Sequence, residues 1–237
     1  MRVALATGPG TPGWPNEDFA AISPGAAVLL DGATSRRGAD IGCVHGVAWY
    51  ARVLGTTLLA AIVAEPRVSL ALALTGAIGE VRALHEDTCD LGNPDSPAAT
   101  VTAVRAAAGG IEYLALSDSS IAADYGDADP PLVITGAAWP AAGASPAAAA
   151  AAVTGTLPLA GLRGIALLSD GATRITDTYG LLSWPAVIGV VRDDGPGELI
   201  RQVRAAEDDD PDRVRWPRHK ARDDATALYW YHDGADV

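Results

Sequence analysis

The tetrapeptide DGAT occurs twice in this chain, within VLLDGAT at residues 28–34 and within IALLSDGAT at residues 165–173. Each copy directly follows an apolar run of the length expected for a buried strand. A strand that ends on Asp-Gly presents a carboxylate at the rim of a sheet, and the glycine lets the backbone turn and come close to whatever the carboxylate binds. A related segment, DDAT at residues 223–226, precedes an apolar stretch. Three carboxylates at one rim would bind hard divalent cations, because Mg²⁺ and Mn²⁺ prefer oxygen ligands.

Strand patterns around these segments come in runs joined by turns, rather than alternating strictly with helices. Strands are predicted at residues 2–7, 19–23, 26–30, 99–107, 111–117, 121–125, 164–169 and 226–231. Helices are predicted at residues 39–64, 69–87, 181–191 and 198–206, with Ser69 as an N-cap. The alanine-rich residues 140–155 fit either a helix or a mobile segment. This order favours an α+β fold with antiparallel sheets, in one domain spanning residues 1–237.

Composition limits the classes of partner. The chain has 237 residues, 49% of them hydrophobic, and a formal net charge of −12. Nucleic acids and anionic membranes attract basic surfaces, so we expect neither as a partner. An acidic chain also repels anionic substrates, so a phosphate-handling site here would need metal ions to reverse the local charge. No signal peptide is recognised, and prolines interrupt the uncharged residues 130–162, so a cytoplasmic protein is expected.

Two cysteines and one histidine fall within, or at the end of, segments predicted to be helical. Cys43 and Cys89 lack the close spacing typical of metal sites, and we interpret them as two buried, reduced thiols. His45 is interpreted as a packed or surface residue rather than a catalytic one.

Five acidic elements follow one another along the chain, each beside a predicted strand. They are NED at residues 16–18, DG at 31–32, SDS at 117–119, DG at 170–171 and DD at 223–224. Together they resemble the metal-dependent protein phosphatases of type 2C, in a short bacterial branch, and the resemblance covers almost the whole chain. It implies two antiparallel β-sheets in a sandwich flanked by pairs of helices.

The resemblance also implies a ligand set for two Mn²⁺ or Mg²⁺ ions, with room for a third, weaker ion. Asp31 would bridge the two ions, and the Gly32 carbonyl would bind one of them. Asp170 and Asp223 would bind the second ion, whereas Asp18 would hold the first through water. Asp118 would support the third ion. Asp224 is expected to serve the loop through hydrogen bonds.

Several positions depart from the family pattern. The stretch 11–15 lacks the arginine that grips the substrate phosphate in much of the family, and Arg36 is the substitute we consider. The first Asp-Gly lacks the glycines that usually follow it. Arg174 stands where relatives carry another aspartate, which would weaken a third metal site.

Three hypotheses follow for the function. The first is a metal-dependent phosphatase acting on phosphoserine or phosphothreonine proteins in bacterial signalling, in which a metal-bridging water attacks the phosphorus. The second is a catalytically weak or inactive phosphatase-like module that binds or regulates a partner. The third is a hydrolase of small phosphoesters. The sequence leaves the substrate, the partner kinase and the oligomeric state open.

Overall fold

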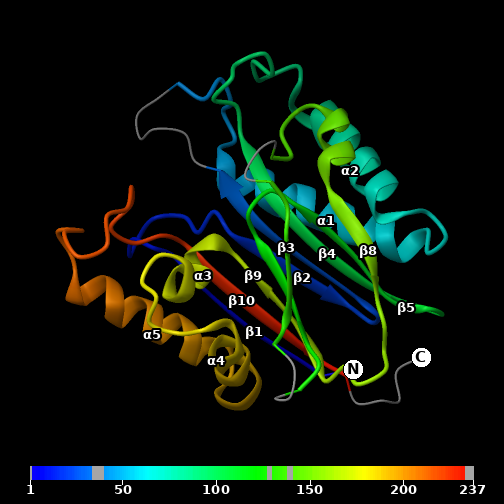
Figure 1. Cartoon of the computed structure of the whole chain (residues 1–237). Coiled ribbons are helices and arrows are strands. Elements are labelled where there is room, and N and C mark those ends of the chain that lie inside the picture. Colours follow the sequence, from blue (N-terminus) through cyan, green and yellow to red (C-terminus); the bar gives the residue numbers. More distant parts are fainter. Residues whose placement is uncertain (1, 34–39, 127–129, 138–140, 233–237) are drawn as a thin grey trace.

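The computed structural model describes residues 2–33, 40–126, 130–137 and 141–232. Two five-stranded sheets lie face to face, and every strand pairing within them is antiparallel. Helices cover the outer face of each sheet (Figure 1). The predicted α+β sandwich is therefore confirmed.

The first sheet has the strand order β1-β10-β9-β6-β7. Its strands are β1 (Arg2–Gly8), β6 (Ser120–Asp124), β7 (Leu132–Thr135), β9 (Gly164–Leu168) and β10 (Ala225–Tyr231). Its outer face is covered by α3 (Asp170–Asp177), α4 (Trp184–Gly189), the π-helical turn η2 (Val190–Asp194) and α5 (Pro196–Asp209). Of these elements, β7 and α3 were not predicted from the sequence.

The second sheet has the strand order β2-β3-β4-β5-β8. Its strands are β2 (Phe19–Ser23), β3 (Ala26–Ala33), β4 (Ala98–Ala107), β5 (Gly110–Leu116) and β8 (Val153–Leu157). Its outer face is covered by α1 (Val47–Ala64) and α2 (Leu70–His85). The undecided residues 140–155 contain the 3₁₀ helix η1 (Pro146–Ala151) and the start of β8.

The core consists of three apolar layers. One lies between the two sheets, and the other two lie between each sheet and its covering helices. By length and composition, α1 is apolar enough to cross a membrane, with 39% of its 18 residues buried. Its packing against the second sheet and against α2 accounts for that apolar character.

Helix boundaries follow local backbone chemistry. The predicted helix at 39–64 begins only at Val47, because Gly42 and Gly46 adopt positive φ angles of 63° and 81°, outside the helical region. Ser69 caps α2 as predicted, since its hydroxyl accepts a hydrogen bond from the backbone N–H of Leu72 at 3.3 Å. The hairpin between β4 and β5 is confirmed, but its turn is formed by Ala108 and Gly109, because Gly110 already pairs with Ala107 as the first residue of β5.

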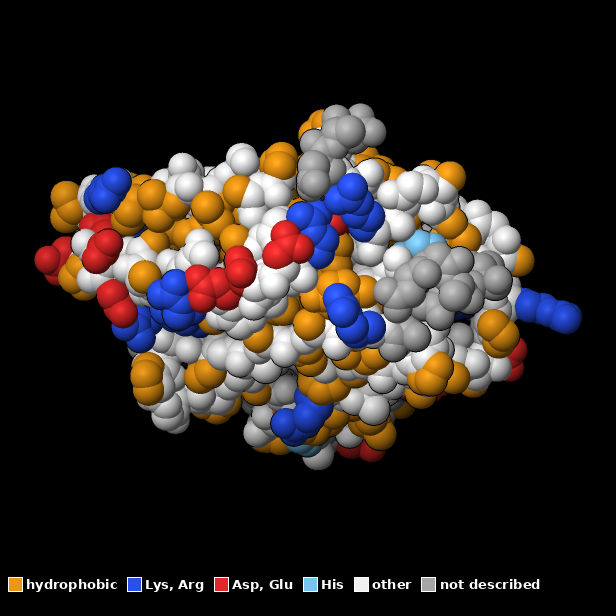
Figure 2. All heavy atoms as spheres, turned by 90° about the horizontal axis from the view of Figure 1, so that it is seen from below, with side chains coloured by type: hydrophobic (Ala, Val, Ile, Leu, Met, Phe, Trp, Pro, Cys, Tyr) orange, Lys and Arg blue, Asp and Glu red, His pale blue; other side chains and the backbone are white. Residues whose placement is uncertain are grey.

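Charges of both signs are dispersed over the face of the molecule shown in Figure 2. Among its described residues, Lys and Arg side chains alternate with acidic and hydrophobic ones rather than gathering into one basic patch.

Candidate active site

Strand ends from both sheets place acidic residues at one rim of the sandwich. Asp31 lies near the end of β3 and pairs in register with Thr100 of β4. Asp170 follows β9 after Ser169 and opens α3, and Asp18 immediately precedes β2. Neither Asp-Gly pair forms a turn: the first continues β3, and the second begins a helix.

Two hydrogen bonds join these carboxylates across the sheets. The Ser169 hydroxyl donates to Asp18 Oδ2 at 2.9 Å, and the backbone N–H of Asp170 donates to Asp31 Oδ2 at 3.4 Å. The Thr226 N–H in turn donates to Ser169 Oγ at 2.9 Å, which fixes the serine. We call Asp18, Asp31 and Asp170 the carboxylate cluster. Nothing in the sequence alone singled out Ser169, whose role depends on this cross-sheet contact.

Burial makes the carboxylate cluster electrostatically unfavourable for three negative charges. Burial is the largest cause that raises the pKa of Asp18 to about 7, and the charges of Asp224 and Asp170 add to it. Burial, followed by the charges of Asp18 and Asp170, raises the pKa of Asp31 well above its usual value. The pKa of Asp170 is raised as well, by burial and then by the charge of Asp223. A cation in the cluster would relieve all three effects.

One carboxylate oxygen in the cluster has no protein partner. Asp18 is 8% exposed, and its Oδ1 is buried without a hydrogen bond. Buried polar atoms are nearly always paired, so an unpartnered oxygen beside two other carboxylates fits a metal ligand. The residues present therefore fit a divalent cation.

The glycines of both Asp-Gly pairs allow close packing rather than turns. A Cβ atom on Gly32 would lie 2.5 Å from Val47 Cγ1 and 2.7 Å from the Glu17 carbonyl oxygen. A Cβ atom on Gly171 would collide with the backbone carbonyl of Asp224. Because these two glycines have no side chain, α1 can pack against Gly32 and the loop before β10 can pack against Gly171. Both elements therefore lie against the rim that carries the cluster.

Asp223 lies beside the cluster, but its oxygens already have cationic partners. Arg174 Nη2 lies 2.6 Å from Asp223 Oδ2, and Lys220 Nζ lies 2.7 Å from Oδ1. Arg174 also contacts Glu207 at 3.4 Å. Metal ligation by Asp223 stays a prediction, and it would require a metal ion to exchange with these two cations. The sequence flagged Arg174 as a departure but did not indicate its pairing with Asp223.

The remaining predicted residues divide into three cases. Asp224 acts through hydrogen bonds as predicted, but on the loop between β1 and β2: its two oxygens accept from the N–H groups of Gly10 and Glu17, both at 2.7 Å. Asp118 is exposed between β5 and β6, close enough for its charge to help raise the pKa of Asp170. Arg36 lies outside the described residues.

Comparisons with known proteins agree with this architecture. The family model described as protein phosphatase 2C matches residues 11–193. Among curated proteins, the comparison finds no match.

Solved structures resemble the chain over nearly its full length. A point mutant of a bacterial serine phosphatase is 13% identical, with a TM-score of 0.69, over 98% of this chain and 99% of that one. The PPM Ser-Thr phosphatase MsPP from Mycobacterium smegmatis, in complex with cacodylate, is 16% identical, with a TM-score of 0.64, over 98% of both chains. The catalytic domain of the serine/threonine phosphatase PstP, in complex with two manganese ions, is 14% identical, with a TM-score of 0.60, over 97% of both chains.

These structures share the fold, and the family model covers residues 11–193, which include Asp18, Asp31, Asp118 and Asp170. The chain therefore belongs to the protein phosphatase 2C family.

Proposed function

We propose that this protein is a Mn²⁺- or Mg²⁺-dependent phosphatase that hydrolyses phosphoserine and phosphothreonine in proteins. The observation that carries the proposal is the carboxylate cluster, which combines a buried Asp18, with its unpartnered oxygen, and the partly buried Asp31 and Asp170. Membership of the phosphatase family supports the reaction class, and the two manganese ions in the PstP structure support the choice of metal.

Each residue of the cluster would have a defined task. Asp31, Asp170 and the Gly32 carbonyl would hold the ions, and Asp18 would hold one of them through water. Bound Mn²⁺ or Mg²⁺ supplies activation of water at neutral pH and neutralises phosphoryl oxygens. The Ser169 hydroxyl keeps Asp18 oriented through its 2.9 Å hydrogen bond.

Lys220 provides positive charge at the edge of the cluster. Its side chain is 42% exposed and pairs with Asp223. Partial burial opposes its charge, but the negative charges around it, that of Asp223 foremost, outweigh burial and raise the pKa of Lys220. Because no arginine occurs at residues 11–15, we propose that Lys220 helps to attract the substrate phosphate. Arg36 remains a further proposed phosphate ligand.

Hydrolysis of p-nitrophenyl phosphate tests the proposal. Purified protein is assayed with Mn²⁺ and with EDTA, alongside Asp170→Asn and the control Asp212→Asn, which changes an exposed carboxylate in the loop after α5. We expect Mn²⁺-dependent turnover in the wild type and the control, and a loss of at least a hundredfold in Asp170→Asn. Turnover that persists in EDTA, or in Asp170→Asn, would overturn the assignment.

A second candidate function is a phosphatase-like module that binds a phosphoprotein without hydrolysing it. The pairing of Asp223 with Arg174 and Lys220 favours it, since these cations occupy the carboxylate expected to bind the second ion. No turnover by a folded protein that still binds a phosphopeptide would support this candidate. Faster hydrolysis of small esters than of a phosphopeptide would instead favour a small-molecule phosphatase.

A further inference from the structure

Four sulfur- and nitrogen-bearing side chains meet at one place between the ends of α1 and α2. Cys43 and His45 lie in the segment that precedes α1, His85 is the last residue of α2, and Cys89 follows in the next loop. The interpretation of the cysteines as buried thiols within helices is therefore wrong. Both are half-exposed and lie in loops, because α1 starts later and α2 ends earlier than the apolar pattern predicts.

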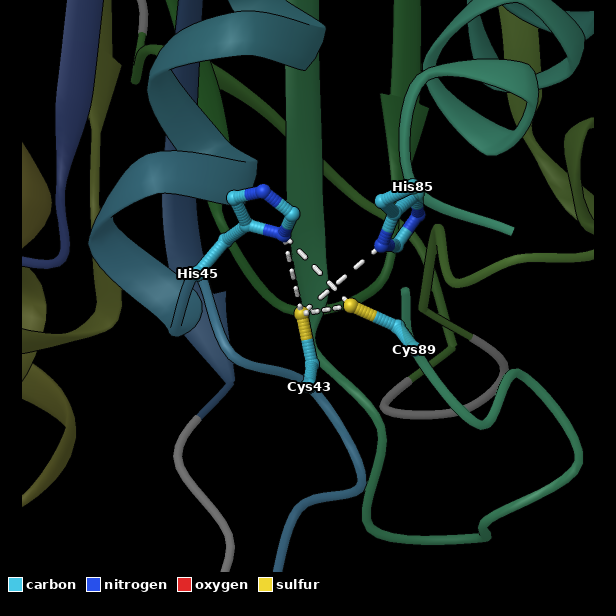
Figure 3. A group of neighbouring side chains, drawn as sticks. All are labelled: Cys43, His45, His85 and Cys89. Atoms are coloured by element: carbon cyan, nitrogen blue, oxygen red, sulfur yellow. Dashed lines mark hydrogen bonds between the residues drawn. The ribbon is translucent and has the colours of Figure 1, made fainter. Parts of the chain in front are cut away.

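The four potential ligand atoms point toward one another (Figure 3). All of them lie within 4.8 Å of one another. Cys43 Sγ is 3.8 Å from His45 Nδ1 and 3.7 Å from His85 Nδ1, and Cys89 Sγ is 3.4 Å from His45 Nδ1. The two sulfur atoms are 3.1 Å apart.

These separations resemble the edges of a tetrahedron around zinc. Zinc binds thiolate sulfur at about 2.3 Å and imidazole nitrogen at about 2.0–2.1 Å, so its ligand atoms lie about 3.3–3.8 Å apart in tetrahedral geometry. Two cysteines with two histidines are one of the common sets for closed, structural zinc sites. The three sulfur–nitrogen distances of 3.4–3.8 Å fall at or near this range.

A disulfide is the competing interpretation of the two cysteines. The sulfur separation of 3.1 Å is longer than the bond length of about 2.05 Å and shorter than the zinc edge of about 3.8 Å. In a disulfide, the sulfur atoms carry neither a proton nor a negative charge. The two histidine nitrogens directed at them would then have no hydrogen-bond or ionic partner. The convergence of both Nδ1 atoms on the cysteines therefore favours a metal ion.

Aromatic packing fixes the histidines in this orientation. His45 stacks on Trp49 with ring centroids 4.2 Å apart, and His85 lies against Trp49 and Tyr50 at 5.4 and 6.1 Å. His85 is only 2% exposed, and its Nε2 is buried with no hydrogen-bond partner. A buried histidine whose Nδ1 faces two thiols is thus pre-oriented as a ligand.

The charges of this ligand set also suit a zinc ion. Two thiolates would balance the charge of one Zn²⁺ ion, with two neutral imidazoles completing the site. Binding to the protonated site would release two thiol protons.

We propose that Cys43, His45, His85 and Cys89 bind one Zn²⁺ ion in a closed tetrahedral site, separate from the carboxylate cluster. The ion would fasten the segment before α1 to the end of α2. Backbone contacts already join these segments: the Asp90 N–H donates to the Gly42 carbonyl at 2.7 Å.

The position of α1 links this site to the carboxylate cluster. Val47, the first residue of α1, lies close to Gly32, the residue after Asp31. An ion bound two residues before Val47 would therefore hold the start of α1 against the strand that carries Asp31. Its role is structural, so its presence does not depend on turnover at the carboxylate cluster.

Zinc binding is tested on reduced protein from which metal has been removed. The buffer contains excess Mg²⁺, because Mg²⁺ occupies sites made of oxygen ligands and leaves a site of two sulfur and two nitrogen ligands free. Zn²⁺ alone is titrated in, and bound metal is measured by elemental analysis. Cys43→Ser and Cys89→Ser are compared with His219→Ala, which removes a histidine outside the cluster. We expect about one Zn²⁺ per chain in the wild type and the control, and at least a tenfold weaker affinity in each cysteine variant.

Three measurements on the wild type keep the test independent of variant folding. Co²⁺ in place of Zn²⁺ should give the intense visible bands of a tetrahedral site and thiolate charge transfer. Zn²⁺ should also protect both thiols from a disulfide reagent and raise Tm by roughly 5–10 °C at a hundredfold excess over Kd. No zinc uptake by the folded, reduced wild type would overturn the proposal, as would uptake unchanged in Cys89→Ser or a Co²⁺ spectrum without thiolate bands.

Discussion

Replacing Asp18 with asparagine should stabilise the metal-free protein at pH 8, although it damages the proposed metal site. The pKa of Asp18 is raised from 3.8 to about 7, so its folded form binds a proton more tightly than the unfolded chain does. The stability due to this proton is complete below pH 3.8 and is lost as pH rises through about 7. A shift of about 3 units corresponds to about 4 kcal/mol.

The substitution Asp18→Asn removes the negative charge of the carboxylate, but the gain in the free energy of unfolding is smaller than the full cost of that charge. The side-chain oxygen of the asparagine can keep the hydrogen bond from Ser169. Its NH₂ group would take the place of the unpartnered Asp18 Oδ1. An unpaired buried amide costs about 1–3 kcal/mol. The net gain at pH 8 is therefore about 2 kcal/mol, or roughly 4–8 °C in Tm for a chain of this size.

Thermal unfolding at pH 5 and pH 8, in EDTA and in Mn²⁺, measures the effect. Wild type and the control Asp212→Asn should be less stable at pH 8 than at pH 5 in EDTA, and Mn²⁺ should reverse the loss. In Asp18→Asn, both the pH dependence and the Mn²⁺ response should shrink. A metal-free Asp18→Asn protein that melts below wild type at pH 8 would refute the electrostatic reasoning.

Three further substitutions test the packing and charge around the site. Gly32→Ala should lower stability by about 1–3 kcal/mol in urea denaturation, since its methyl group would lie 2.5 Å from Val47 Cγ1, and an unchanged midpoint would contradict this. Arg174→Ala should free Asp223 and tighten Mn²⁺ binding in calorimetry while lowering Tm; weaker binding would show that the arginine supports the metal site. Ser69→Ala should cost about 1 kcal/mol through the lost α2 cap, with Mn²⁺-dependent turnover unaffected.

Local patterns account for most of the strands and for the family. The DGAT segments mark the ends of β3 and β9, and the glycine pair marks the hairpin between β4 and β5 to within one residue, because these signals depend only on neighbouring residues. The order of acidic elements along the chain was enough to predict the sandwich. The short strands β7 and β8 were missed because their patterns are brief and are set by pairing with β6 and β5.

Contacts between distant residues were beyond the reach of local patterns. The sequence placed Arg174 after the second Asp-Gly, but its 2.6 Å contact with Asp223 joins residues that are 49 positions apart. The cluster of cysteines and histidines likewise joins two short pairs across α1 and α2. The spacing Cys43-x-His45 with His85-x-x-x-Cys89 was a usable signal, because a helical hairpin brings the two ends together.

In the proposed function, the carboxylate cluster hydrolyses phosphoesters with the help of metal ions. The most direct test compares wild type with Asp31→Asn on a phosphothreonine peptide, with phosphate release measured in Mn²⁺ and in EDTA. We predict Mn²⁺-dependent release by the wild type, none above background in EDTA, and a loss of at least a hundredfold in a folded Asp31→Asn protein. Metal-dependent hydrolysis that survives in Asp31→Asn would contradict the account.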